Sequence, residues 1–595
     1  MEFDRVIGIS DRIRKRSIAR YGSLTGFAKR HGFIWFGRVG GLRRFQQVEW
    51  NRVSRLVFAC RGNICRSPYA QARAAALGVP AASFGISAEE GSPVDASAVR
   101  VARQRGLDLT AHRAVPASTF SFQAGDLILC MEPEHGATLA AQRIGGAQTT
   151  LLGLWHADGI TSPYIHDPYG LDDAYFNTCF DLIDRAVGEV ALRLQDQAQR
   201  AWRRERAVLV VEAQSIGSVA VIRSLGLAGY AVHAASNTPK ALGFLSSQTF
   251  ACALCPGYAE SGFLPWLRAY VNAHDILAII PSEGFLLAIE PVYEEIRHLL
   301  PCPQSRHVIY RGMSKVAVHE LLASAPAPIS HHLPASLVVE RDGERPSIAQ
   351  LERLGTPLFL KADALNGGAL AQGTVWRSDR ASEAHALIEH LLQKFARVLV
   401  QGWVPGHGAG VFFLLAKGRV LAEFMHRRLH EVPHTGGVSS YRESWHNAAI
   451  RDDALAKVAH LGWEGVAMLE YRAQPGDKFH FIEFNGRFWG SLHLALWAGI
   501  DFPALLLDTF FGRPPMPGRS YSDAVRCRYT FPYEVQHVWS RLKDRSVPLR
   551  GRFASVVEFF VLGANREIHS DLYFPGDRRL YLEGLKRFVR SVGRS

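Results

Sequence analysis

The chain has 595 residues, of which 48% are hydrophobic and 21% charged, a composition typical of globular domains and unlike that of disordered chains. At roughly 150 residues per domain this length predicts about four structural units. No run of about 18 apolar residues occurs, so we expect no membrane-spanning helix. Eight cysteines exclude a disulfide framework and favour a reducing, cytoplasmic location.

Residues 1–50 form a basic N-terminal extension. They hold 11 Lys and Arg against 4 Asp and Glu, and so supply +7 of the net charge of +13. Such a segment could bind nucleic acid or an anionic membrane surface. The alternative, which we favour, is a solubilising lead-in to the first domain. We therefore do not expect nucleic acid as a partner, and a membrane surface is the weaker alternative.

The first predicted elements are a buried strand at residues 55–59, a loop at 60–68 and an Ala-rich helix at 69–77. A loop between a strand and a helix N-terminus can aim several backbone N–H groups at one anion. Cys60, at the start of the loop, lies in positive potential that favours a thiolate. Arg66 can hold two phosphate oxygens with its planar guanidinium. Ser67 can hydrogen-bond the sulfur, and Asn63 can hold the loop in shape.

The nine residues Cys60 to Pro68 (CRGNICRSP) resemble the signature loop of the low-molecular-weight protein tyrosine phosphatases. The sequence His166 to Gly170 (HDPYG) is similar to the Asp-Pro loop that carries this family's general acid, which here would be Asp167. Further matches lie in order between and after these two motifs, at residues 93–95, 106–113, 126–135 and 176–187. The resemblance assigns residues 53–198 to a phosphatase-like α/β domain with a parallel four-stranded sheet flanked by helices.

This resemblance implies a metal-free reaction in two steps. Cys60 attacks the phosphorus of a phosphomonoester and forms a phosphocysteine, while Arg66 and the loop amides stabilise the equatorial oxygens. Asp167 protonates the leaving oxygen and then activates water. Arg61 and the short stretch 87–91 depart from the family pattern, so the substrate is a phosphorylated protein or a phosphorylated small molecule. Cys65 is either a partner for an oxidised Cys60 or a small buried residue.

A second module begins after the charged segment at residues 195–206. Apolar runs at 207–211, 230–235 and 275–281, separated by helical patterns, predict a parallel α/β domain over residues 207–310. Further strands are predicted at 357–361, 398–404 and 464–471, and within the stretch 479–491. Glu483 and Asn485 alternate with apolar residues, so on a strand they share one face, which Glu470 on the neighbouring strand could join. These are hard oxygen ligands suited to Mg²⁺; the alternative is a surface hairpin with scattered acids.

The second module resembles the ATP-grasp superfamily, particularly its carbamoyl-phosphate-synthase-like members, through Lys361, a Gly-rich turn and the series Glu483-x-Asn485-x-Arg487. The resemblance implies a multi-lobed α+β module, with a two-lobed ATP-grasp domain at residues 311–520. It places Lys315 and Lys361 on the ATP phosphates, and Gln401 and Val404 on the adenine. The remaining implied roles are cofactor binding for Gly367, Gly368 and Arg428, metal binding for Glu470, Glu483 and Asn485, and stabilisation of the transferred phosphoryl group for Arg487.

The implied reaction transfers a phosphoryl group from ATP to a carboxylate, and an amine or similar nucleophile then attacks the acylphosphate. ATP and Mg²⁺, or Mn²⁺ in its place, are the expected cofactors. The segment 521–595 is basic and aromatic, and its sequence indicates no chemistry. We therefore predict a bifunctional enzyme, a tyrosine-phosphatase-type hydrolase joined to an ATP-grasp ligase. The alternatives are that one module is a silent binding unit, or that the chain is a basic scaffold acting through residues 1–50.

Overall fold

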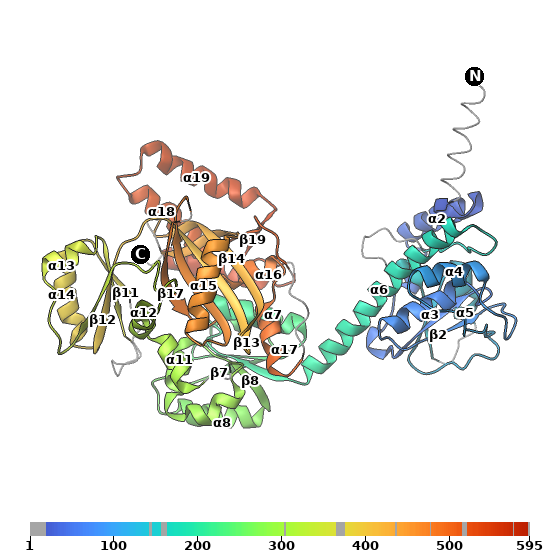
Figure 1. The fold of residues 1–595 in the computed structure, drawn as a ribbon, viewed down its shortest axis with the longest axis horizontal. Coiled ribbons are helices and arrows are strands. Elements are labelled where there is room, and N and C mark those ends of the chain that lie inside the picture. Colours follow the sequence, from blue (N-terminus) through green and yellow to red (C-terminus); the bar gives the residue numbers. More distant parts are fainter. Residues whose placement is uncertain are drawn as a thin grey trace, which may run out of the picture. The chain divides into compact units, whose positions relative to one another are not determined.

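The computed structural model describes residues 19–141, 146–155, 163–302, 305–363, 375–434, 437–476, 478–513, 520–574 and 576–592. The chain divides into two compact units, Met1–Ala201 and Trp202–Ser595. Figure 1 shows the elements of each unit in sequence colours. Among the described residues, no helix has both the length and the apolar character needed to cross a membrane.

The first unit is built on a four-stranded parallel sheet, as expected, and its strand order is β2-β1-β3-β4. The strands are β1 (Arg55–Cys60), β2 (Ala81–Gly85), β3 (Asp126–Cys130) and β4 (Gln148–Leu151). The helices are α2 (Leu24–Arg38), α3 (Arg66–Ala76), α4 (Ala96–Gln104), α5 (Pro133–Ala141) and α6 (Asp173–Arg204).

Successive residues of β1 pack into different hydrophobic clusters, because side chains alternate between the faces of a strand. Leu56 and Phe58 join the cluster that contains Phe180 of α6. Val57 and Ala59 join a second cluster. Since both faces of the central strand are buried, its carboxyl end is held rigidly at the loop that begins with Cys60.

The second unit begins with another parallel sheet, of order β7-β6-β5-β8. Its strands are β5 (Ala207–Val210), β6 (Ala231–Ser236), β7 (Ala251–Leu254) and β8 (Ile276–Ile280). The associated helices are α7 (Ile216–Ala228), α8 (Phe263–Ala273), α9 (Glu283–Ala288), α10 (Tyr293–Ile296), α11 (Arg306–Met313) and α12 (Lys315–Ala323).

A four-stranded antiparallel sheet of order β11-β10-β12-β9 follows. It consists of β9 (Ser336–Glu340), β10 (Leu358–Ala362), β11 (Val375–Ser378) and β12 (Arg397–Gly402), with α13 (Ile348–Arg353) and α14 (Ala381–Leu392). Leu360 of β10 and Ile388 of α14 lie in its hydrophobic core. This sheet carries Lys361 and Gln401 on neighbouring strands.

The largest sheet has seven strands, in the order β17-β16-β13-β14-β15-β18-β19, and is antiparallel except for the β18–β19 pair. Its strands are β13 (His407–Ala416), β14 (Arg419–Val432), β15 (Val438–Ser444), β16 (Gly465–Ala473), β17 (Phe479–Asn485), β18 (Arg526–Arg528) and β19 (Ile568–Ser570). The remaining helices are α15 (Ala448–His460), α16 (Leu492–Trp497), α17 (Phe502–Phe510), α18 (Val535–Lys543), α19 (Leu549–Ala564) and α20 (Arg578–Val592).

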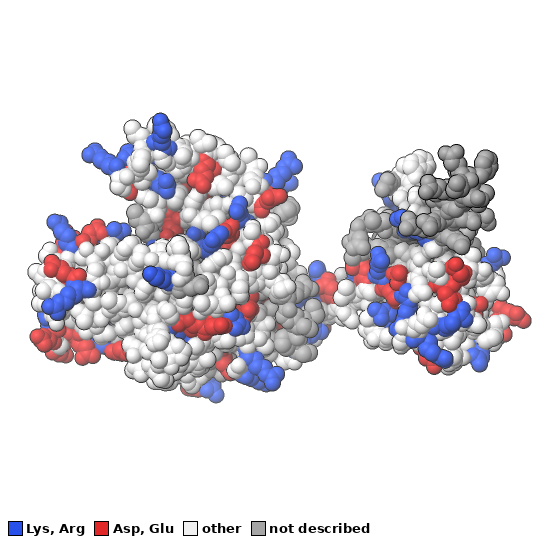
Figure 2. All heavy atoms as spheres, turned by 45° about the horizontal axis from the view of Figure 1, so that its top comes forward, with Lys and Arg blue, Asp and Glu red and all other residues white. Residues whose placement is uncertain are grey.

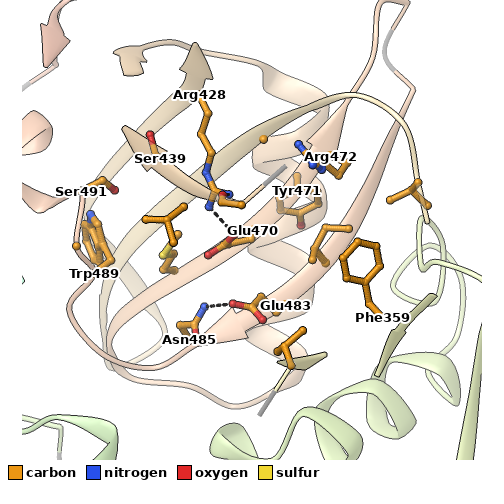
Figure 3. Close-up of a pocket in the computed structure, with 18 of the residues that line it drawn as sticks. Phe359, Arg428, Ser439, Glu470, Tyr471, Arg472, Glu483, Asn485, Trp489 and Ser491 are labelled. Carbon is orange, nitrogen blue, oxygen red and sulfur yellow. Dashed lines mark hydrogen bonds and ion pairs between the residues drawn. The ribbon is translucent and has the colours of Figure 1, made fainter. Parts of the chain in front are cut away.

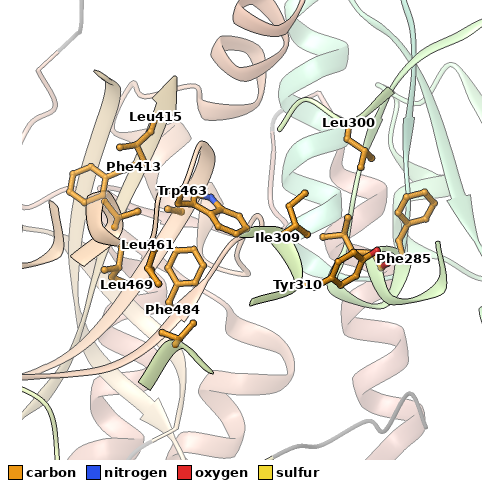
Figure 4. Packing of buried hydrophobic residues seen from close by; sticks show 14 of the residues in the cluster. Phe285, Leu300, Ile309, Tyr310, Phe413, Leu415, Leu461, Trp463, Leu469 and Phe484 are labelled. Atoms are coloured by element: carbon orange, nitrogen blue, oxygen red, sulfur yellow. Dashed lines mark hydrogen bonds between the residues drawn. The ribbon is translucent and has the colours of Figure 1, made fainter. Parts of the chain in front are cut away.

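One hydrophobic cluster joins the large sheet to the α/β part of the second unit. Trp463 lies between Ile309 of α11 and strand residues such as Phe413, as Figure 4 shows. Its indole nitrogen donates a hydrogen bond to the carbonyl of Val466 over 3.0 Å, so its polar group is satisfied inside the core. This shared core fixes the end of β17, and therefore Glu483 and Asn485, relative to α11 and α12.

Two stretches differ from the sequence-based interpretation. Residues 195–206 look like a polar linker, but α6 continues through most of them to Arg204. The ion pairs Arg193–Glu189 and Arg200–Asp196 have i,i+4 spacing, which stabilises an exposed helix. Segment 521–595, to which the sequence assigns no chemistry, supplies two strands of the large sheet.

Candidate active sites

The loop after β1 brings polar groups onto the Cys60 sulfur. The hydroxyl of Ser67 lies 3.0 Å from Cys60 Sγ, and the backbone N–H of Asn63 donates to the same sulfur over 3.3 Å. Helix α3 starts at Arg66, earlier than the predicted residue 69, so its N-terminus is part of the loop. Hydrogen-bond donors and a helix N-terminus around one sulfur stabilise negative charge there.

Asn63 holds this loop in shape from a left-handed backbone conformation, with a φ of 55°. Its side-chain amide donates to Ser67 Oγ at 2.8 Å and to Ser83 Oγ at 2.9 Å. The side-chain oxygen of Asn63, Oδ1, accepts a hydrogen bond from the backbone N–H of Val115 over 2.9 Å. Asn is one of the few residues that tolerate a positive φ. The Asn63 side chain is buried and holds three groups together, although Ser67 Oγ also contacts Cys60 and Ser83 Oγ also donates to Gln71.

We expect Asn63→Ala to lower the free energy of unfolding of the first unit by about 2–4 kcal/mol, because buried hydrogen bonds are lost and a Cβ stays in the left-handed region. The loss of phosphatase activity in urea measures this change. Asn63→Gly is the matched control, since it loses the same hydrogen bonds without the backbone strain and should cost less. If the urea midpoint is unchanged in both variants, the Asn63 amide does not stabilise the loop.

Arg66 is 1% exposed and is held by two carboxylates and a carbonyl. Its guanidinium lies 2.7 Å from Asp167, 2.6 Å from Glu132 and 2.7 Å from the carbonyl oxygen of Ile165. Burial alone would lower the pKa of Arg66, but Asp167, Cys60 and Glu132 raise it above its ordinary value. The predicted anion-binding arginine and the predicted general acid therefore lie at the same site, as expected from the sequence.

Cys65 is buried in the same loop, and this burial raises the pKa of its thiol. Its environment therefore disfavours the thiolate. Both interpretations of Cys65 remain predictions.

Helix α2 of the basic extension packs next to the loop that carries Asp167. Ser23 Oγ lies 3.1 Å from His166 Nε2, and the other ring nitrogen of His166 lies 2.8 Å from the hydroxyl of Tyr164. Lys29 forms an ion pair with Glu134 at 3.0 Å. This part of the extension thus contacts the residue immediately before the predicted general acid, a structural role that charge counting does not suggest.

The second candidate site is a pocket of about 730 Å³ in the second unit. Strand β10 contributes Phe359 and Lys361 to its lining, and the large sheet contributes Arg428, Glu470 and Glu483. Figure 3 shows these sheet residues directed toward the same space, together with Ser439 and Trp489. A pocket of this size can hold a nucleotide-sized ligand.

Glu483 and Asn485 project from the same face of β17, as the alternation predicts. Asn485 Nδ2 donates to Glu483 Oε1 over 3.0 Å (Figure 3). Lys315 Nζ donates to Asn485 Oδ1 over 3.0 Å and lies 3.6 Å from Glu483. Burial alone would raise the pKa of Glu483, but Lys315 and Lys361 outweigh burial and lower it. Glu483 is therefore a carboxylate held ionised by two lysines.

Lys361 is almost fully buried. Its ammonium donates to the carbonyl of Ile482 over 2.9 Å and lies 4.0 Å from Glu483. Burial lowers the pKa of Lys361 to about 8. A buried amine that titrates near neutral pH is typical of a functional site.

Glu470 lies directly across from Glu483 in the β16–β17 pair. Its carboxylate lies 2.5 Å from Arg428, which also donates to the carbonyl of Gly437 over 2.8 Å. Arg428 and the two glutamates thus all line the wall of the pocket, with Arg428 paired to Glu470 (Figure 3).

The other predicted contacts are placed as follows. Gln401 and Val404 line the pocket at the end of β12. Arg487 also lines it, with its Nε 3.4 Å from Glu283. Gly367 and Gly368 lie outside the described residues.

Within the described residues, no group of three or more His, Cys, Asp or Glu side chains is placed to hold a metal ion. The predicted ligands are instead two carboxylates and one amide, from Glu470, Glu483 and Asn485. These are hard oxygen donors on adjacent strands, and their chemistry suits Mg²⁺. The donor set therefore fits the ion that the resemblance implies.

The C-terminal segment 521–595, to which the sequence assigns no chemistry, also contributes to this pocket. Tyr529, Tyr533 and Asp571 line it, and Asp571 forms a buried ion pair with Arg442 of β15. No local motif marks these residues. Their position follows from strands β18 and β19 joining the large sheet next to β15.

Comparison with known proteins gives results for both units. The profile of the family described as low molecular weight phosphotyrosine protein phosphatase matches residues 55–200. The low molecular weight protein-tyrosine-phosphatase Etp of Escherichia coli strain K12 is 34% identical over 152 residues, which cover 25% of this chain and 97% of Etp.

Two solved structures are also similar. Wzb of Vibrio vulnificus, in complex with benzylphosphonate, shares 31% identity over 24% of this chain and 98% of its own, with a TM-score of 0.21. A biotin carboxylase from Campylobacter jejuni, described as a β,γ-ATP complex, shares 15% identity over 54% of this chain and 74% of its own, with a TM-score of 0.42.

Proposed function

Because residues 55–200 belong to the low molecular weight phosphotyrosine protein phosphatase family, we propose that the first unit hydrolyses phosphotyrosine through a phosphocysteine on Cys60. The main support is the Cys60 sulfur, which accepts a backbone N–H and lies beside the Ser67 hydroxyl at a helix N-terminus.

In this mechanism the Cys60 sulfur attacks phosphorus, and the bond to the tyrosine oxygen breaks as Asp167 gives that oxygen a proton. Arg66 and the loop amides carry the charge on the equatorial phosphate oxygens. Asp167 then takes a proton from water, which attacks phosphorus and releases phosphate and the Cys60 thiolate. In the ligand-free protein Arg66 is held by Asp167 and Glu132, so phosphate would have to replace or share these contacts.

For the second unit we propose an ATP-dependent ligase of the ATP-grasp type. The observation that supports it is the pocket in which Lys361, on one sheet, faces Glu483, on another, at 4.0 Å. Lysines suit the phosphates of ATP, and Glu470, Glu483 and Asn485 would hold Mg²⁺, which neutralises phosphate charge when bound. Gln401 and Val404 would contact the adenine, and Arg487 and Arg428 the transferred phosphoryl group.

The proposed ligase reaction joins a carboxylate to an amine or a similar nucleophile. It is tested by measuring ADP release with Mg²⁺–ATP and panels of carboxylates, using hydroxylamine as a general acceptor that converts acylphosphates to hydroxamates. Hydroxamate that forms only with ATP and one class of carboxylate supports the proposal. ATP that neither binds nor turns over with any carboxylate contradicts it.

We expect the affinity for ATP to fall as the pH rises from about 7 to about 9, because Lys361 has a pKa lowered to about 8 and loses its positive charge over this range. The terminal phosphate of ATP has already ionised below about pH 7, so its charge stays constant. Titration calorimetry at constant ionic strength measures the affinity. Lys361→Met should bind ATP more weakly and with no such pH dependence; equal pH dependence in both proteins would contradict this assignment.

A further inference from the structure

Helix α19 carries a continuous apolar stripe. Its residues Leu549, Phe553, Val557, Phe560 and Val561 are each between 61% and 69% exposed. The first four are spaced three or four residues apart, and Val561 directly follows Phe560, so they lie on one face of the helix. At about 1.5 Å per residue the 16-residue helix is about 24 Å long, and the stripe from Leu549 to Val561 covers about 18 Å of it.

The opposite face of α19 is packed against the rest of the second unit. Ser555 is buried, and Arg528 donates to the carbonyl of Phe559 over 3.2 Å. The Arg528 guanidinium also lies 4.9 Å from the centre of the Phe559 ring. These contacts orient the helix, so the apolar stripe faces outward as a fixed feature of the fold.

Basic side chains gather beside the stripe. Residues 535–564, which form α18, the turn and α19, hold five Lys and Arg against two Asp and Glu. The basic residues are Arg541, Lys543, Arg545, Arg550 and Arg552. Both acids face histidines: Asp544 lies 2.9 Å from His434, and Glu558 lies 3.4 Å from His430. In Figure 2 the upper-left lobe, where Figure 1 labels α18 and α19, is largely white with several blue side chains and fewer red ones.

Trp539 of α18 adds an aromatic ring to this surface. It is 57% exposed, and Lys543 Nζ lies 5.1 Å from its ring centre. An exposed Trp and Phe next to Lys and Arg is typical of helices that lie in the headgroup region of a membrane, where the rings enter the acyl boundary and the cations meet lipid phosphates.

We propose that the α18–α19 hairpin, residues 535–564, binds the surface of an anionic phospholipid membrane. The apolar stripe would be buried at the acyl boundary, and the exposed basic side chains Lys543, Arg545 and Arg550 would contact the headgroup phosphates. Charge complementarity favours lipid over a second copy of this chain, since two such hairpins would bring ten cations together against four acids. This site is independent of both proposed enzymatic functions.

The test is co-sedimentation of the full chain with vesicles of phosphatidylcholine alone or mixed with phosphatidylglycerol. We expect binding to the mixed vesicles only, weakening as salt rises from about 0.1 M to about 1 M. The double variant Phe553→Ser/Phe560→Ser should lower the partition coefficient at least about tenfold. The charge variant Lys543→Glu/Arg545→Glu/Arg550→Glu should lower it similarly.

Phe250→Ser is the matched control, because Phe250 is 73% exposed and lies beside His233 in another part of the unit. It should bind vesicles like the unaltered chain, and all variants should keep their phosphatase activity. Failure of the unaltered chain to bind mixed vesicles would overturn the proposal, as would full binding by both hairpin variants. If sedimentation shows a dimer that Phe553→Ser/Phe560→Ser dissociates, a second copy covers the stripe and the membrane proposal is wrong.

Discussion

Replacing Cys60 by serine is expected to reduce the hydrolysis of p-nitrophenyl phosphate, and of phosphotyrosine peptides, to the rate measured without enzyme. A serine hydroxyl fits where the thiol lies and can keep the contacts to Ser67 Oγ and the Asn63 N–H. It is a far weaker nucleophile than a thiolate, because a hydroxyl keeps its proton at neutral pH, and Asp167 must itself be protonated in this step to serve as the acid. The loss should therefore come from chemistry and not from unfolding.

Two further variants separate the nucleophile from its surroundings. Asp167→Asn removes the proton donor and should lower kcat by about 10²–10⁴-fold while leaving Cys60 able to react. Cys65→Ser makes the same chemical change five residues away in the same loop and should keep most of the activity. If Cys60→Ser hydrolyses the substrate as fast as the unaltered chain, Cys60 is not the nucleophile. A total loss in Cys65→Ser would point to the integrity of the loop as the cause.

The second large effect is expected for Glu483→Gln, which should lower ATP-dependent hydroxamate formation by about 10²-fold or more. The change keeps the shape of the side chain but removes the charge that lies opposite Lys315 and Lys361. It also removes one of the oxygen ligands proposed for Mg²⁺. Both the charge and the proposed ligand act on the ATP phosphates. The rate of ATP turnover should therefore fall by a larger factor than the affinity for ATP.

Glu423→Gln provides the control on the same large sheet. Glu423 pairs with Arg451 at 2.7 Å, and the same substitution there should leave ATP turnover unchanged. Thermal unfolding of both variants distinguishes a damaged site from a damaged fold. A Glu483→Gln protein with full ATP turnover would contradict the proposed site, while phosphatase activity should be the same in all three proteins.

The parts that sequence predicts well are those whose chemistry lies within one turn or one strand. The order strand, loop and helix around Cys60 follows from an apolar run and a Pro in the first turn. The shared face of Glu483 and Asn485 follows from the period of two along a strand. In both places the residues that act together are separated by fewer than ten positions, so local geometry determines their relation.

Contacts across long separations in sequence were not predictable in this way. Arg66 meets Glu132 because β1 and β3 are neighbours in the sheet, and a single sequence does not reveal which strands pair. Tyr529 and Asp571 reach the pocket through the two short strands β18 and β19, each only three residues long. Strands of that length lack a periodic pattern, and the segment therefore reads as basic and aromatic without a role.

Because β18 and β19 bring the C-terminal segment to the pocket, this segment can be exchanged to change which molecules the pocket accepts. If Lys361, Gln401 and Glu483 serve the nucleotide, then Tyr529, Tyr533 and Asp571 form part of the wall available to the molecule that receives the phosphoryl group. Grafting residues 521–592 from a homologue should then redirect the choice of acceptor without altering nucleotide use. A chain cut before this segment would lose the wall, and with it any selectivity among acceptors.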